Sequence, residues 1–303
     1  MKVLITGGAG FIGSHIAEAF QNKAEVVVLD NLRTGNQNNL EGLNVTFVNG
    51  DIRERDIVKS CMKRVDCVFH LAAIVSAPES MLNLTECIEI NNKGSLIVLE
   101  EAAKAGVKKL CYSSSSAIYG DSPASPQLET MLPAPKSPYA VSKLDGEYYC
   151  KIFMETKKLP TISLRYFNVF GPRQNLNSAY AAAIPIFISK SLRNENIPIY
   201  GDGEQTRDFI YVKDIVKANI YFFQNNYTGV YNVGYGQKIT INDLASKIRI
   251  ATNSSSKVRY LPERKGDVKH SLASIKKLLS TGFRASSDFD SGLEDTISFF
   301  ALE

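Results

Sequence analysis

The sequence is poor in the residues that build metal centres and disulfide frameworks. Its three histidines, His15, His70 and His270, follow no ligand spacing, so we expect no metal site. Its five cysteines are odd in number and include no Cys-x-x-Cys pair; they are Cys61, Cys67, Cys87, Cys111 and Cys150. This pattern predicts reduced, mostly buried thiols in a cytoplasmic protein.

A long apolar run and a strong excess of charge are also missing. No apolar run is long enough to span a bilayer and no signal-peptide pattern opens the sequence, so we expect no membrane partner. The formal net charge is only +4 and the basic residues are scattered, which argues against a nucleic-acid partner. The 303 residues are 44% hydrophobic and 22% charged, as in a globular protein with a large core.

The first motif is a glycine-rich loop behind a short apolar strand at residues 2–6. Gly7, Gly10 and Gly13 allow a tight turn, a close approach of the backbone to phosphate, and close packing of the following helix. That helix should begin near Phe11 and offer the free amides of its first turn to a pyrophosphate. The loop therefore predicts a dinucleotide site.

An acidic residue follows at the spacing that the dinucleotide motif requires. A second strand at residues 25–29 runs into Asp30, about 20 residues beyond the loop, where a carboxylate binds the adenosine ribose. A carboxylate there repels a 2′-phosphate, which favours NAD over NADP. Arg33 lies close enough to keep NADP as an alternative.

The strands continue in alternation with helical stretches. Further strands are expected at residues 45–48, 67–70 and 109–112. This alternation predicts an α/β fold of Rossmann type, a doubly wound parallel sheet followed by a smaller C-terminal α/β substrate lobe. We expect an NAD-binding domain at 1–165, a sheet completed by about 208–235, and an interleaved substrate lobe at 166–303.

Candidate ligand contacts follow the ends of these strands, where sheets of this type bind ligands. Asp51, after the third strand, is placed to accept a hydrogen bond from the adenine amine, although routine loop chemistry explains it as well. The segment Leu71–Ala73 after the fourth strand lets the backbone approach the cofactor, and Ser113–Ser116 end the fifth strand. His70 is more typical of a packed core histidine.

The stretch from Ser137 to Lys143 predicts the catalytic helix. Ser137 is typical of a helix N-cap and Pro138 of a first helical residue. Tyr139 and Lys143 then stand one turn apart on one face. We expect the lysine to lower the pKa of the tyrosine and so make it a usable general base. A lone Tyr-x-x-x-Lys is more often part of an ordinary helix, but here it accompanies a nucleotide site.

These motifs resemble those of the extended short-chain dehydrogenase/reductase superfamily, and most of all its UDP-sugar 4-epimerases that act on N-acetylated UDP-hexoses. The similarity runs nearly end to end and includes residues 165–171, 201–203, 207–209 and 265–272. It implies an NAD-dependent isomerase that interconverts UDP-N-acetylglucosamine and UDP-N-acetylgalactosamine, and UDP-glucose and UDP-galactose, through a 4-keto intermediate. It implies Ser115 as the catalytic serine, Tyr139 as the base and Lys143 as its partner.

The resemblance also implies which residues contact the ligands. The residues implied to bind NAD are Gly7, Gly10, Phe11, Ile12, Gly13, Asp30, Asn31, Asp51, Ile52, Leu71, Ala72, Ala73, Asn91, Tyr139, Lys143 and Tyr166. Those implied to bind the substrate are Ser115, Asn168, Ala182, Arg207, Arg264, Asp267 and Ser271. Among these, Arg207 and Arg264 would bind the pyrophosphate, Asp267 the uridine ribose, and the small Ser271 would leave room for an N-acetyl group.

Three alternatives remain. A 4,6-dehydratase would need an acidic pair after the catalytic serine, where this chain has Ser116-Ala117. The glutamate that a decarboxylase would need in the same stretch is also missing from this chain. A UDP-glucuronate-type 4-epimerase stays open, because nothing in the sequence excludes a substrate carboxylate. A non-catalytic NAD-binding protein would have no need of Ser115, Tyr139 and Lys143. The resemblance also predicts a homodimer through the helix that carries Tyr139 and the helix before it.

Overall fold

The computed structural model describes residues 1–122, 124–176, 182–263 and 268–302, and the chain divides into two compact units. The first unit comprises Met1–Ile118, Pro135–Tyr166 and Ile215–Tyr231. The second unit comprises Tyr119–Ala134, Phe167–Asp214 and Asn232–Glu303. Each unit is therefore assembled from separate stretches of the chain.

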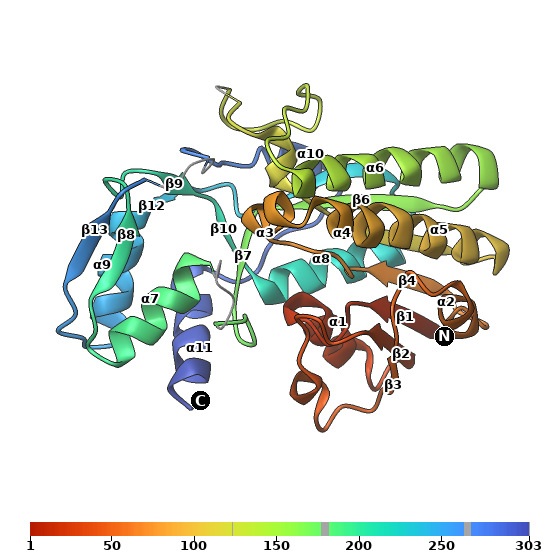
Figure 1. The fold of residues 1–303 in the computed structure, drawn as a ribbon, viewed down its shortest axis with the longest axis horizontal. Coiled ribbons are helices and arrows are strands. Elements are labelled where there is room, and N and C mark those ends of the chain that lie inside the picture. The colour runs from red at the N-terminus through yellow and green to blue at the C-terminus, as the bar shows by residue number, and fades with distance from the viewer. Residues whose placement is uncertain (123, 177–181, 264–267, 303) are drawn as a thin grey trace. The chain divides into compact units, whose positions relative to one another are not determined.

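A seven-stranded sheet in the order β11-β6-β5-β4-β1-β2-β3 organises the first unit (Figure 1). Its strands are β1 (Lys2–Thr6), β2 (Glu25–Asp30), β3 (Thr46–Asn49), β4 (Cys67–His70), β5 (Lys109–Ser115), β6 (Thr161–Tyr166) and β11 (Gly229–Val233). From β6 to β3 each strand runs parallel to its neighbour, with Ile5 opposite both Val28 and Phe69. The predicted doubly wound α/β fold is confirmed.

Helices cover both faces of this sheet, as Figure 1 shows. They are α1 (Phe11–Phe20), α2 (Arg55–Cys61), α3 (Ala77–Leu82), α4 (Leu84–Cys87), α5 (Ser95–Lys104), α6 (Pro138–Lys157) and α8 (Val212–Gln224). Short 3-10 helices η1 (Gln37–Leu40) and η3 (Ser116–Tyr119) and the π-helix η2 (Ile88–Gly94) complete the set.

The two-sided cover explains why the strands are apolar along their whole length. On one face Leu4 and Leu29 belong to a core cluster with side chains of α2, α5 and α6. On the other face the Phe20 ring of α1 and the Phe223 ring of α8 pack on Phe69 with ring centres 5.4 and 6.1 Å apart. The carboxyl ends of the strands remain as the edge where a ligand can bind.

In the second unit the described residues form three two-stranded sheets and four helices. The strands are β7 (Asn168–Phe170) with β10 (Phe209–Tyr211), β8 (Ile197–Tyr200) with β13 (Val258–Leu261), and β9 (Thr206–Arg207) with β12 (Ile239–Thr240). The helices are α7 (Ala183–Leu192), α9 (Ile241–Ala251), α10 (Lys276–Ser280) and α11 (Phe289–Ala301). Phe170, Phe209, Tyr211 and Phe289 form its aromatic core.

The state of the cysteines and the character of the helices can be compared with the predictions made from the sequence. All five cysteines are free and buried, as predicted. Among the helices of the described residues, none combines the length and apolarity that a bilayer span would need.

Candidate active site

The glycine-rich loop forms a cradle that a side chain would fill. Gly7 has a φ of +71°, and a Cβ there would lie 2.7 Å from the backbone nitrogen of Ala72. A Cβ on Gly13 would lie 2.3 Å from the carbonyl oxygen of Gly7. Gly10 is the N-cap of α1 and brings no side chain to its first-turn amides. The loop thus fits a pyrophosphate at the start of α1, beside Phe11 and Ile12.

Asp30 ends β2 beside this cradle. Its carboxylate is buried and accepts hydrogen bonds from the amides of Ala9 at 3.0 Å and Leu32 at 2.8 Å. Burial raises the pKa of Asp30, and these two amides oppose the shift. Two amides leave acceptor capacity on the carboxylate, so Asp30 fits the ribose hydroxyls of NAD.

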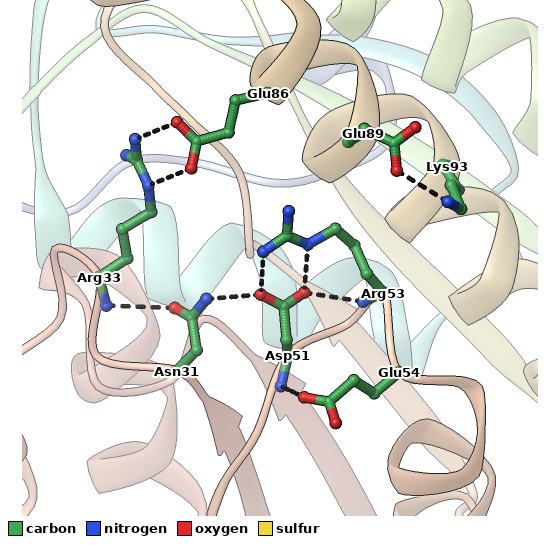
Figure 2. Close-up of polar contacts among 8 residues, drawn as sticks. All are labelled: Asn31, Arg33, Asp51, Arg53, Glu54, Glu86, Glu89 and Lys93. Carbon is green, nitrogen blue, oxygen red and sulfur yellow. Dashed lines mark hydrogen bonds and ion pairs between the residues drawn. The ribbon is translucent and has the colours of Figure 1, made fainter. Parts of the chain in front are cut away.

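Arg33 is engaged by two carboxylates. Its guanidinium contacts Glu79 of α3 at 2.7 Å and Glu86 of α4 at 2.9 Å (Figure 2 shows the Glu86 pair). These contacts raise the pKa of Arg33, although burial opposes them. The Arg33 guanidinium, which left NADP as an alternative to NAD, is therefore already paired with two carboxylates of the protein.

Asp51 and Asn31 follow the ends of β3 and β2 and are joined by a hydrogen bond of 2.8 Å (Figure 2). The Asp51 carboxylate also accepts from the backbone amide and the guanidinium of Arg53, which lowers its pKa to about 2. The next residue, Ile52, is buried in the core cluster. Four protein N–H donors already hydrogen-bond this carboxylate. The expected hydrogen bond from the adenine amine to Asp51 stays a prediction.

Asn91 holds the loop that follows β4. Its side-chain amide accepts from the backbone nitrogen of Ile74 at 2.7 Å and donates to its carbonyl at 2.9 Å. It also donates to the Ser142 hydroxyl of α6 at 2.9 Å. Asn91 is buried in the π-helix η2, and such helices recur at functional sites. It therefore fixes the loop that contains Leu71, Ala72 and Ala73.

Tyr166 ends β6 with its hydroxyl between Ser113 at 3.2 Å and Asn219 at 3.1 Å. Burial raises its pKa well above the usual value. The implied contact of Tyr166 with NAD stays a prediction.

The catalytic helix begins as the sequence predicts. Ser137 is the N-cap of α6 and accepts from the Ala140 amide at 3.2 Å, and Pro138 is the first helical residue. The Tyr139 amide donates to the Ser80 hydroxyl of α3 at 3.1 Å. The first turn of α6 is thereby fixed against its neighbour.

Ser115, Tyr139 and Lys143 come together in the first unit. The Ser115 Oγ accepts from the Ala117 amide at 3.1 Å and hydrogen-bonds the Tyr139 side chain. The Lys143 Nζ donates to the Ser113 carbonyl at 2.8 Å and lies 6.0 Å from the centre of the Tyr139 ring. The amide fixes the serine oxygen, which leaves the serine proton for the phenol oxygen.

The expectation that Lys143 lowers the pKa of Tyr139 is wrong for the protein alone. Burial raises the pKa of Tyr139, and the opposing effect comes from the Ser115 hydrogen bond. Burial also lowers the pKa of Lys143 to about 8. The causes of the Tyr139 shift are burial, the Ser115 hydrogen bond and Cys87, while the Lys143 Nζ is bound to the Ser113 carbonyl.

Sequence reasoning missed a buried ion pair behind this group. Arg165 of β6 contacts Glu147 of α6 through two hydrogen bonds of 2.8 and 2.7 Å, and Ser114 donates to the same carboxylate. Both charged side chains are only 5% exposed. Glu147 stands one turn beyond Lys143, and that spacing was the available signal.

Apart from Ser115, the substrate-binding candidates that the structure describes belong to the second unit. Asn168 donates its backbone and side-chain N–H groups to the Asp208 carbonyl, at 3.1 Å each. The Arg207 guanidinium donates to the carbonyl oxygens of Thr206 and Lys269 at 3.0 and 3.2 Å. Ser271 is buried and donates its amide to the Thr206 carbonyl.

Of the other substrate-binding candidates, the structure describes only Ala182. Ala182 is the exposed N-cap of α7. Arg264 and Asp267 lie outside the described residues, as does the 177–181 segment next to Ala182. Their implied roles stay predictions.

Asp208 organises the segment that carries Ser271. Its buried carboxylate accepts from the amides of Tyr235, Gly236 and Ala273 at 2.8 to 3.0 Å. Burial outweighs these bonds and raises its pKa to about 6. From the sequence, Asp208 was noted only as the residue between Arg207 and Phe209, with no role of its own. Phe209 packs in the aromatic core of the second unit.

The cradle, Asp30 and the tyrosine–lysine helix define a nicotinamide-dependent enzyme of short-chain dehydrogenase/reductase type. Residues 3–234 match the family described as NAD dependent epimerase/dehydratase, and the chain belongs to that family. The predicted family and the predicted cofactor NAD are confirmed.

Solved structures of the same fold carry epimerase names. A UDP-N-acetylglucosamine 4-epimerase from Methanobrevibacter ruminantium M1, in complex with UDP-N-acetylmuramic acid, is 44% identical; the match covers 99% of this chain and 98% of that one, with a TM-score of 0.97. A UDP-glucose 4-epimerase from Thermotoga maritima with UDP-glucose is 37% identical over 100% of both chains, with a TM-score of 0.96.

A third structure carries a uronic acid. A UDP-glucuronic acid 4-epimerase from Bacillus cereus, in complex with NAD and UDP-4-deoxy-4-fluoro-glucuronic acid, is 29% identical over 100% of this chain and 99% of that one, with a TM-score of 0.93. The predicted enzyme class, an NAD-dependent epimerase and hence an isomerase, is confirmed.

Proposed function

We propose that the protein is a 4-epimerase of UDP-hexoses that interconverts UDP-N-acetylglucosamine and UDP-N-acetylgalactosamine, and also UDP-glucose and UDP-galactose. The observation that carries this proposal is that the end of β5 and the start of α6 bring together Ser115, Tyr139 and Lys143. Ser115 hydrogen-bonds Tyr139, and the Lys143 Nζ, bound to the Ser113 carbonyl, lies 6.0 Å from the centre of the tyrosine ring. The likeness to UDP-N-acetylglucosamine and UDP-glucose 4-epimerases supports the choice of substrate.

In this proposal Tyr139 takes the proton of the C4 hydroxyl, and Ser115 donates a hydrogen bond to the oxygen that is losing it. NAD, held by the Gly7–Gly13 cradle and Asp30, would supply the hydride acceptor and donor that epimerisation at C4 needs. Lys143 holds the site together through Ser113 and orients the ribose of the cofactor. Tyr139 returns the proton at the end, so no net oxidation remains.

The phosphate contacts position the nucleotide while the sugar turns. Arg207 and Arg264 are proposed for the pyrophosphate, because a planar guanidinium binds phosphate oxygens in pairs. Asn168 would contact the sugar-diphosphate and Asp267 the uridine ribose. Ala182 and the small Ser271 are proposed to border the N-acetyl group.

A UDP-glucuronate 4-epimerase is the second candidate, and the likeness to such an enzyme favours it specifically. A 4,6-dehydratase is less well supported. Its acidic pair would stand at Ser116-Ala117, and there the Ala117 amide instead bonds the Ser115 hydroxyl. A non-catalytic protein would leave the hydrogen-bonded serine, tyrosine and lysine without a role.

The test is to incubate the purified protein with UDP-N-acetylglucosamine, without added NAD, and to resolve the 4-epimers by proton NMR. UDP-glucose, UDP-glucuronate and dTDP-glucose run in parallel, and Tyr139→Phe is the inactive control. Conversion of the N-acetyl substrate supports the proposal. Turnover of UDP-glucuronate alone would select the second candidate, and a 4-keto-6-deoxy product would select a dehydratase.

The proposed sugar pocket has its own variant. Ser271→Tyr should lower kcat/KM for UDP-N-acetylglucosamine by at least about tenfold, since the site is buried and a ring must displace the N-acetyl group. UDP-glucose turnover should fall far less. An equal loss on both substrates would argue against Ser271 as the residue beside the 2-substituent.

We also propose a homodimer and a cytoplasmic location. Two neighbouring helical segments of the first unit expose apolar side chains, namely Met81, Leu84, Ile88, Val141, Tyr148 and Ile152. Asn92 donates to Asp145 at 2.6 Å and joins the two rows. Ile152→Lys should give a monomer by light scattering, whereas Leu132→Lys, also at an exposed apolar residue, should not.

The proposed cytoplasmic location is supported by the free thiols, which are typical of that compartment.

A further inference from the structure

Arg33 joins two parts of the first unit that are distant in sequence. It lies in the loop after β2, and its guanidinium binds Glu86 through both carboxylate oxygens, at 3.3 and 2.9 Å. A third contact of 2.7 Å reaches Glu79. Figure 2 shows the Arg33–Glu86 pair and the row of contacts beside it, in which the Arg33 amide binds Asn31 and Asn31 binds Asp51.

The strand order says what this bridge crosses. The sheet runs β4-β1-β2, so β1 lies between the two strands whose following segments the bridge connects. Arg33 follows β2, whereas Glu79 and Glu86 belong to the helices that follow β4. The contact must therefore pass over the carboxyl end of β1, where the Gly7–Gly13 cradle lies.

Both ends of the bridge are held by further contacts. On one side Asn31 bonds Asp51, whose carboxylate is bound by Arg53. On the other side α3 carries Glu79 next to Ser80, and the Ser80 hydroxyl binds the amide of Tyr139. The bridge thus connects the adenosine end of the cradle to the first turn of the catalytic helix.

We propose that Arg33, Glu79 and Glu86 form a strap that closes over bound NAD and slows its release between turnovers. The proposal rests on the NAD dependence of the protein and on the epimerase proposed above, because an epimerase that reduces and reoxidises its cofactor in one cycle must not lose it in between. Arginine suits the strap because its five donors can hold two carboxylates at once. The strap is anchored on both sides of the Gly7–Gly13 cradle, so opening it requires breaking the ion pairs of Arg33 with Glu79 and Glu86.

The experiment measures cofactor release without any sugar. Holoprotein is diluted into buffer with an NAD-consuming trap, and NAD remaining on the protein is quantified over time after acid release. Arg33→Gln and the double variant Glu79→Gln/Glu86→Gln should each raise the release rate by about five- to tenfold, the worth of two partly exposed ion pairs. High salt should bring the wild-type rate toward that of the variants.

A matched control exists on the same face of the sheet. Arg55 of α2 also holds two carboxylates, Glu100 at 2.6 Å and Glu101 at 2.7 Å, and connects α2 to α5. Arg55→Gln removes the same kind of contact away from the cradle, and NAD release should be unchanged.

The two strap variants separate the proposal from its rivals. If Arg33→Gln releases NAD faster but the glutamate pair does not, Arg33 touches the cofactor directly and the strap is refuted. If neither variant differs from Arg55→Gln, the bridge does not retain NAD. Because no sugar is present, a wrong substrate assignment leaves these outcomes unchanged. Thermal unfolding of the cofactor-free variants shows whether a faster release reflects a general loss of fold.

Discussion

The buried pair of Glu147 and Arg165 should be the most sensitive contact behind the catalytic residues. Both side chains are 5% exposed, and two hydrogen bonds of 2.8 and 2.7 Å join them. Removing one partner leaves the other charge buried without its counter-ion, which costs about 3–5 kcal/mol. Glu147→Gln and Arg165→Met should each lose stability of that size.

Replacing both partners should cost much less. The double variant Glu147→Leu/Arg165→Met exchanges two buried charges for apolar groups, and such exchanges are often neutral or stabilising. In chains of about 150–250 residues 1 kcal/mol corresponds to roughly 2–4 °C in melting temperature, so on that scale each single variant should melt about 6–20 °C lower. The double variant should recover most of that shift.

Urea unfolding at fixed NAD concentration measures the effect, and Glu89→Gln is the control. Glu89 forms an exposed pair with Lys93 on the π-helix η2, so its loss should change stability by less than about 0.5 kcal/mol. Because Glu147 stands one turn beyond Lys143, the single variants should also lower kcat more than they raise KM. Single losses below about 1 kcal/mol, or a double variant as unstable as the sum, would refute this reasoning.

Two further predictions concern protonation. Tyr139→Phe should lower kcat by about 10²–10⁴-fold, because the phenol that is proposed to take the C4 proton is then missing. His70 is buried between Thr6 and Ser95, and burial, with a smaller effect of Lys143, lowers its pKa from 6.5 to about 3. Its contribution to stability is present above pH 6.5 and is lost as pH falls toward 3, which amounts to about 2 kcal/mol between pH 7 and pH 5. Because the raised pKa of Asp208 acts in the opposite direction, the effect is measured as the difference in urea unfolding between the wild type and His70→Gln. His70→Gln should remove that part of the pH dependence.

Local patterns predicted the first unit well because its elements depend on neighbouring residues. The strand at 2–6 and the helix start at Phe11 match β1 and α1, and Ser137 caps α6. The fifth strand was predicted to end in the Ser113–Ser116 run, and β5 ends there, at Ser115. Its last residues pair with β6, where Ser115 lies opposite Tyr166, and such pairing leaves no mark in the local sequence.

Contacts between residues that are far apart in the chain could not be predicted from the sequence. Arg33 was known only as a basic residue near Asp30, and its partners Glu79 and Glu86 lie 46 and 53 residues away. The helices that carry them follow a different strand, so only the strand order brings the three together. For the same reason Asp208 could not be recognised as the acceptor of three amides from two other segments.

The pKa of Tyr139 shows why spacing alone does not determine chemistry. One helical turn between Tyr139 and Lys143 predicts attraction between an ammonium and a phenolate, and the sign of that effect is right. Its size depends on what else the two groups touch, and here burial disfavours the charged form of both. In the protein alone, burial therefore favours the neutral forms of both side chains. The oxidised nicotinamide ring is cationic, so NAD bound beside Tyr139 would supply positive charge that favours the phenolate, and a strap that retained NAD would also help to preserve the base.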